Sequence, residues 1–97
     1  MVKEDKVYIL GGGVTGLVLA YELLKHGQLV EIIEKSDTVG GLAKTLSWKG
    51  RSIDMGPHIY HTPDKDIQDY WEREFEGLFY NRDHWSKNLK DGEFFDY

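Results

Sequence analysis

The feature that most constrains this chain is a short apolar run that leads directly into a glycine-rich turn. Residues 7–10 (Val-Tyr-Ile-Leu) are followed by Gly11, Gly13 and Gly16 at the spacing G-x-G-x-x-G. In that pattern the first glycine permits a tight turn, the second permits close approach to a pyrophosphate, and the third allows a helix to pack on a strand. A helix expected over 14–26 would direct its free N–H groups and its positive dipole end to the same point. The sequence therefore predicts a dinucleotide-binding turn.

A second apolar run completes the unit. It opens at Gln28, after Gly27 ends the expected helix, and finishes at Glu34. Strand, helix and strand in this order predict an α/β fold with a right-handed crossover between two parallel strands. We expect residues 7–10 to form a central strand that is apolar on both faces, with residues 3–6 as a charged lead-in. The candidate cofactor contacts of this unit are Gly11, Gly13, Val14, Thr15 and Gly16.

Glu34 is a candidate ligand for a ribose. It stands at the carboxyl end of the second predicted strand, where such folds place the acid that accepts hydrogen bonds from the adenosine ribose. Its negative charge would repel a 2′-phosphate, so the pattern favours FAD or NAD over NADP. The alternative is a solvated carboxylate at the end of a strand.

Length and composition exclude several functions. The chain has 97 residues, a net charge of -5 and no cysteine. The acidic balance argues against nucleic acid or an anionic membrane surface as a partner. The lack of cysteine excludes a thiolate nucleophile and a sulfur-based zinc site. No apolar run is long enough for a signal peptide or a membrane span, so a cytoplasmic location is expected.

A second glycine pair follows the acid. Gly40 and Gly41, placed in this way, resemble the second fingerprint of the flavoproteins that group amine oxidases, protoporphyrinogen oxidase, phytoene desaturases and UDP-galactopyranose mutase. The resemblance implies FAD as the cofactor, with both glycines in contact with it and with Lys35 and Thr45 as further candidates. Many members carry Arg after the pair, whereas this chain has Leu42, so that phosphate contact is missing. An ordinary glycine turn is the alternative.

The segment 56–62 (Gly-Pro-His-Ile-Tyr-His-Thr) is the second most informative stretch. Together with the residues up to Tyr70 it resembles UDP-galactopyranose mutase within that group. The resemblance implies that Gly56 and His58 are neighbours of the isoalloxazine ring, with His61 a weaker candidate. A neutral imidazole could also donate a hydrogen bond to a flavin nitrogen or a sugar. Structural histidines are the alternative, and no metal is expected because no third ligand clusters with the two.

The resemblance has consequences for the whole chain. It implies an N-terminal FAD-binding domain over 1–97, in which 57–97 lead into the substrate region of a longer parent enzyme. That parent would use reduced FAD to convert the pyranose ring of a nucleotide sugar, such as UDP-galactose, into a furanose. Two alternatives stay open: an oxidoreductase of the amine oxidase or protoporphyrinogen oxidase type, in which FAD takes a hydride, and a nucleotide-binding module without turnover. We expect the isolated 97 residues to be inactive; their oligomeric state is open.

Local signals predict three further elements. Lys49-Gly50 indicates a hairpin between 45–48 and 51–54. Thr62 and Pro63 predict the cap and first position of a helix that reaches about Glu76, with an apolar stripe for core packing. Asp91-Gly92 indicates a second hairpin, between 85–90 and 93–97, in which Lys90 faces Glu93. The aromatic residues of its last strand could line a pocket in an intact protein.

Overall fold

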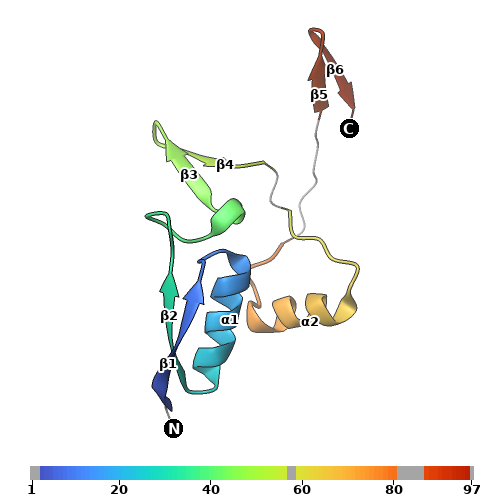
Figure 1. Cartoon of the computed structure of the whole chain (residues 1–97). Helices are drawn as coiled ribbons and strands as arrows, with labels where there is room; N and C mark the ends of the chain where they lie inside the picture. Colours follow the sequence, from blue (N-terminus) through green and yellow to red (C-terminus); the bar gives the residue numbers. More distant parts are fainter. Residues whose placement is uncertain (1–2, 57–58, 81–86, 97) are drawn as a thin grey trace. The chain divides into compact units, whose positions relative to one another are not determined.

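The computed structural model describes residues 3–56, 59–80 and 87–96 (Figure 1). The chain forms two compact units, residues 1–59 and residues 60–97, and each is described by itself. Among the described residues, no helix combines the length and the apolar character that a membrane crossing needs.

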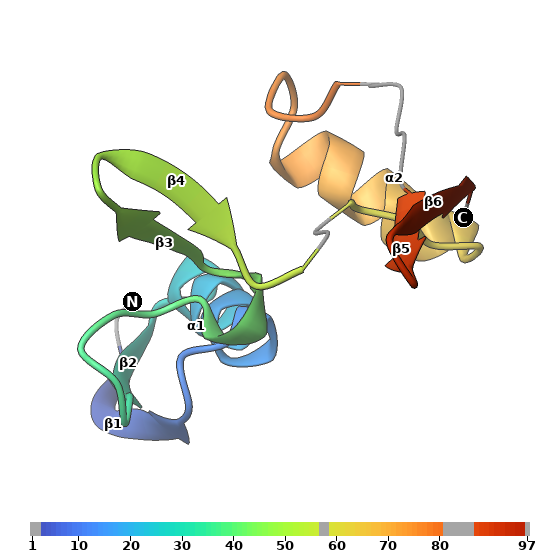
Figure 2. The same cartoon turned by 90° about the horizontal axis from the view of Figure 1, so that it is seen from above.

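The first unit begins with the predicted strand–helix–strand arrangement. It consists of β1 (Lys3–Leu10), α1 (Val14–Lys25) and β2 (Gln28–Ile33). The two strands run parallel, in a register that pairs Val7 with Val30 and Leu10 with Ile33, and α1 packs alongside them (Figure 2). The α/β prediction is confirmed.

The first strand differs from its prediction in two respects. It begins at Lys3, so the charged lead-in belongs to the strand. The side-chain amide of the buried Gln28 donates a hydrogen bond to the Asp5 carbonyl, which ties the lead-in to the start of β2. The expectation of a strand buried on both faces is wrong: Ile9 is 8% exposed but Leu10 is 82% exposed. Because β1 and β2 form a two-stranded sheet in the described residues, only the face of Ile9 is covered, by α1.

The first unit ends with a short 3-10 helix, η1 (Gly41–Ala43), and a hairpin of β3 (Thr45–Trp48) and β4 (Arg51–Asp54). Figure 2 shows the two antiparallel strands of this hairpin. Lys49 and Gly50 both have positive φ, as a two-residue turn of this kind requires. The predicted hairpin is confirmed at its predicted bounds.

The second unit contains α2 (Lys65–Glu74), β5 (Lys87–Lys90) and β6 (Glu93–Asp96). The second hairpin pairs Lys90 with Glu93 as predicted. Residues 85 and 86, which were expected to begin it, lie outside the described residues. The predicted stripe of α2 is not a buried core, since Ile67 is 47% exposed. Instead, aromatic rings gather on one side of the helix at centroid distances of 5.1–6.2 Å: Tyr60, Tyr70, Trp71, Phe75 and Phe79.

The cap of α2 is a correction to the sequence analysis. The helix starts at Lys65 and its N-cap is Asp64, whose carboxylate accepts hydrogen bonds from the backbone N–H groups of Asp66 and Ile67. Thr62 accepts instead from the backbone N–H of Asp64, at 3.2 Å. A carboxylate is the better cap because it also interacts favourably with the helix dipole.

We therefore predict that Asp64→Ala destabilises α2 by about 1 kcal/mol, the usual cost of losing an N-cap. Thr62→Ala is the matched control and should cost less than half as much, since Thr62 accepts no bond from the helix itself. Thermal unfolding of each variant, monitored through the backbone NMR shifts of α2, measures the two losses of stability. An equal loss in the two variants would contradict the assignment of the cap.

Candidate cofactor-binding site

The first glycine turn is fixed to the end of β2. Gly11 has a φ of +108°, a conformation that side-chain-bearing residues rarely adopt, and its N–H donates to the Ile33 carbonyl at 2.8 Å. Gly16 is buried in α1, and a Cβ at this position would lie 2.1 Å from the Gly11 carbonyl oxygen. The third glycine of the motif therefore allows α1 to lie against the turn.

The N-terminus of α1 opens into a cleft. Gly13 caps the helix with extended backbone, no side chain bonds to the N-terminus, and the first turn contains no acidic residue. The N–H groups at the start of a helix have no partner within the helix, and together with the dipole they form a site suited to an anion.

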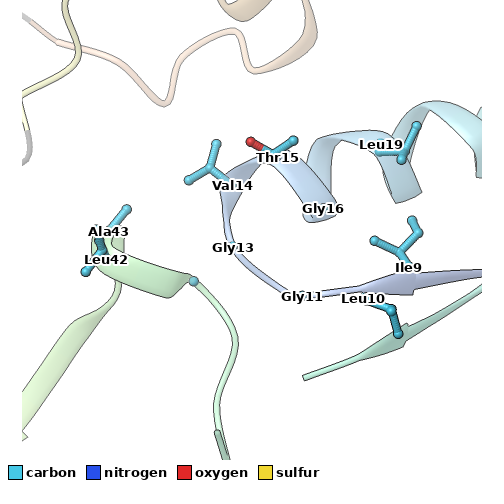
Figure 3. A pocket seen from close by; sticks show the side chains of 11 residues that line it. Ile9, Leu10, Gly11, Gly13, Val14, Thr15, Gly16, Leu19, Leu42 and Ala43 are labelled. Atoms are coloured by element: carbon cyan, nitrogen blue, oxygen red, sulfur yellow. The ribbon is translucent and has the colours of Figure 1, made fainter. Parts of the chain in front are cut away.

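The cleft has a volume of about 590 Å³. Figure 3 shows Val14 and Thr15 at the start of α1, with Leu42 and Ala43 on η1. The cleft is lined by residues of β1, the glycine turn, α1, η1 and the glycine before η1: Ile9, Leu10, Gly11, Gly13, Val14, Thr15, Gly16, Leu19, Gly40, Leu42 and Ala43.

The second glycine pair lies directly against the first turn. Gly40 has a φ of +117°, and its N–H donates to the Gly12 carbonyl at 2.8 Å. A Cβ on Gly41 would lie 3.1 Å from the Gly13 Cα. The two glycine segments, far apart in the sequence, therefore form the two walls of one cleft.

Glu34 follows β2 and is half-buried. Its Oε1 accepts from the N–H of Gly12 at 2.9 Å, and its Oε2 accepts from the N–H of Ser36 at 2.7 Å. The Ser36 and Gly12 hydrogen bonds hold the pKa of this carboxyl below its usual range, and the nearby Lys44 ammonium adds to the effect. Glu34 is therefore anionic at neutral pH and rigidly held.

Several candidates are not among the residues that line the cleft: Glu34, Lys35, Gly41, Thr45 and Gly56. Lys35 is exposed, and the Thr45 hydroxyl is engaged with the Asp54 carboxylate across the hairpin at 2.5 Å. Gly56 has a φ of +95°. His61 belongs to the second unit, where it is exposed. His58 lies outside the described residues. Within 3–56, 59–80 and 87–96, no three His, Asp or Glu side chains are arranged to hold a metal ion.

Sequence reasoning missed one residue, Gly12. It is buried, its N–H donates to Glu34 and its carbonyl accepts from the Gly40 N–H, so one residue connects three parts of the site. The available signal was the run of three consecutive glycines, of which the G-x-G-x-x-G pattern uses only two.

The strand–turn–helix geometry, the cleft at the N-terminus of α1 and the acid after β2 define a dinucleotide-binding domain of Rossmann type. The comparison with known families agrees. The chain belongs to the family described as NAD(P)-binding Rossmann-like domain, whose model matches residues 9–73.

The chain is also similar to particular enzymes. It is 42% identical over 64 residues to 4,4'-diapophytoene desaturase (4,4'-diaponeurosporene-forming) of Staphylococcus aureus strain COL, and equally to that of strain Newman. The match covers 64% of this chain and 13% of the desaturase. The crystal structure of a CLA-producing fatty acid isomerase from P. acnes superimposes with a TM-score of 0.64 at 28% identity, over 98% of this chain and 23% of that one.

These relatives bear on the resemblance found in the sequence. Membership of the flavoprotein group that includes the phytoene desaturases is confirmed, and FAD is the cofactor that this membership supports. The relatives reported above are a desaturase and an isomerase, so they lend no support to a UDP-galactopyranose mutase or to a nucleotide-sugar partner. The chain spans only a small part of either relative.

Proposed function

We propose that this chain binds the ADP part of FAD, with the pyrophosphate at the N-terminus of α1 and the adenosine ribose beside Glu34. The observation that carries the proposal is the N-terminus of α1, whose glycine N-cap makes no side-chain hydrogen bond and which opens into a cleft walled by two glycine segments. Side chains are missing where a phosphate must come close to backbone N–H groups. The proposed contacts are Gly11, Gly13, Val14, Thr15, Gly16, Glu34, Gly40 and Gly41.

The charges of the site support a dinucleotide without a 2′-phosphate. Glu34 is anionic, and none of the described residues that line the cleft carries a basic side chain. The pyrophosphate would therefore be held by backbone N–H groups and the helix dipole alone. A further phosphate on the ribose would meet the Glu34 carboxylate, which disfavours NADP.

We propose further that the intact protein is a flavin-dependent oxidoreductase or isomerase, since the relatives named above are by their titles a desaturase and an isomerase. FAD, when bound, supplies reversible hydride acceptance from a C–H bond. The residues of this chain bind and orient the nucleotide end of the cofactor. A sugar mutase takes second place, because neither of those titles names a mutase or a sugar substrate.

Calorimetric titration of the folded chain with FAD, NAD and NADP tests the cofactor assignment. We expect FAD to bind with the highest affinity and NADP with the lowest, and we expect Glu34→Lys to reduce the discrimination against NADP. Glu31→Lys is the matched control, because Glu31 lies on β2, three residues before Glu34, and pairs with Lys6 at 3.7 Å. Equal affinities for NADP and FAD, or no FAD binding by the folded chain, would overturn the proposal.

A gain-of-affinity variant tests the position of the pyrophosphate. Leu42 is 81% exposed and lines the cleft opposite the start of α1. Leu42→Arg should place a guanidinium within reach of the phosphates and raise the affinity for FAD about tenfold, the effect of one hydrogen bond to a charged group at an exposed site. Leu42→Gln is the neutral control of similar reach, and the gain should shrink as salt is added. A gain with Gln as large as with Arg would argue against a phosphate at this place.

A further inference from the structure

Gly12 is the residue at which three parts of the site meet. Its N–H donates to Glu34 Oε1 at 2.9 Å, and its carbonyl oxygen accepts from the Gly40 N–H at 2.8 Å. The other carboxylate oxygen of Glu34 accepts from the Ser36 N–H. The first glycine turn, the chain that follows β2 and the second glycine loop are thus joined through one carboxylate and one glycine residue.

We propose that Glu34 is a positioning residue that holds the backbone of Gly12 in place and, through this residue, docks the second glycine loop onto the first before any cofactor is bound. This role is additional to the contact with a ribose, because an ionised carboxylate has about four acceptor sites and the two backbone bonds use only two of them. The inference deepens the proposed function, and only its ligand measurement rests on that function.

The packing around Gly12 shows why a glycine stands at this position. A Cβ would lie 3.0 Å from Val39 Cγ1 and 3.4 Å from Glu34 Oε1. Both neighbours belong to the segment between β2 and the second glycine pair. A side chain at position 12 would therefore require the Val39 side chain to move, whereas the glycine lets this segment lie against the first turn.

The charge of Glu34 strengthens the coupling. Hydrogen bonds to an ionised acceptor are about twice as strong as neutral ones. The bond to Glu34 restrains the backbone N–H of Gly12, and the carbonyl that accepts from the Gly40 N–H is attached to the same Cα. Loss of the carboxylate should thus be felt at the Gly40 N–H, through the position of Gly12.

Amide hydrogen exchange of the ligand-free chain tests the proposal. In Glu34→Gln, a side chain of the same shape can no longer accept from both Gly12 and Ser36. We expect the Gly40 amide to exchange at least about fivefold faster, while the Ile9 amide in the core of the unit stays protected. Glu31→Gln is the matched control, which removes one carboxylate from β2 and should leave the exchange of the Gly40 amide unchanged. Unchanged exchange at Gly40 in Glu34→Gln would overturn the proposal.

A titration of the unmodified chain gives the same answer should Glu34→Gln fail to fold. The Gly40 amide shift and the Glu34 side-chain carboxyl carbon, followed by NMR as the pH is lowered, should change with one common midpoint. A Gly40 shift that stays flat while Glu34 titrates would overturn the proposal. Titration with FAD separates this proposal from the cofactor assignment. If the Gly40 amide exchanges faster in Glu34→Gln but the unmodified chain does not bind FAD, only the cofactor assignment is refuted. If Glu34→Gln weakens FAD binding without a change at Gly40, Glu34 is a ribose ligand only.

Discussion

Gly16→Ala is expected to destabilise the first unit by about 3 kcal/mol and to abolish FAD binding. The added Cβ would lie 2.1 Å from the Gly11 carbonyl oxygen, 3.2 Å from the Gly11 carbonyl carbon and 3.2 Å from Ile9 Cγ2. The first two neighbours are backbone atoms of the tight turn and cannot rotate away, so α1 must shift from β1. Overpacking of this kind costs about 1 to 3 kcal/mol or more, and the roughly 1 kcal/mol by which alanine favours a helix over glycine does not offset it. Urea unfolding measures the loss.

Gly13→Ala is the control that distinguishes a loss of stability from a loss of FAD binding. Gly13 has an ordinary φ of -77°, and its added Cβ would lie 3.9 Å from the nearest atom, the Gly41 Cα. The free energy of unfolding should therefore fall by only about 1 kcal/mol, the usual cost of alanine at an N-cap. The methyl group would nevertheless enter the cleft at the cap of α1, where the phosphates are proposed to lie, and the affinity for FAD should fall about tenfold or more. Equal stability losses at both positions would contradict this division of roles.

The βαβ unit could be predicted from the sequence because each of its signals is local. The spacing of Gly11, Gly13 and Gly16 fixes the turn, the apolar period fixes the helix, and Glu34 follows from the end of the second strand. The role of Gly12 could not be predicted in the same way. Its two hydrogen-bond partners, Glu34 and Gly40, depend on how the ends of parallel strands meet in space, and a sequence pattern does not contain that arrangement.

The charged start of β1 and the cap of α2 show two other limits of prediction from the sequence. Residues 3–6 look like a lead-in by composition, but backbone pairing and the buried Gln28 amide hold them in the strand. Thr62 and Asp64 are both good capping residues two positions apart, so propensity alone does not choose between them. The structure chooses Asp64, whose carboxylate reaches two N–H groups of the helix.

Thr45, a candidate cofactor contact in the sequence analysis, has a hydrogen-bond partner within the hairpin. The hairpin turn at Lys49-Gly50 sets a register that pairs Thr45 with Asp54, and the threonine hydroxyl bonds to that carboxylate. Following the register outward from the turn would have predicted this partner. Thr45 therefore contributes to the hairpin, whereas the glycine loop just before it walls the cleft.

Gly40→Ala is expected to detach the second glycine loop from the first glycine turn without unfolding the βαβ unit. Gly40 has a φ of +117°, and an added Cβ would lie 2.7 Å from Lys44 Cβ and 3.2 Å from Lys44 Cα. Strain at such a φ costs about 1 to 3 kcal/mol, and the loop can relieve it by giving up the Gly40 N–H bond to the Gly12 carbonyl. The loop would then leave the first turn, and the affinity for FAD should fall by about tenfold to a hundredfold, measured by calorimetry.

The control for this variant is Gly50→Ala. Gly50 has a φ of +75° in the hairpin turn, and an added Cβ would meet nothing within 4 Å. It imposes backbone strain on the same unit but outside the cleft lining, so stability should fall while the affinity for FAD stays within about twofold. If both variants weakened FAD binding equally, the loss would reflect general destabilisation. A loss confined to Gly40→Ala would instead identify the contact between the two glycine loops as the feature that prepares the cleft for a dinucleotide.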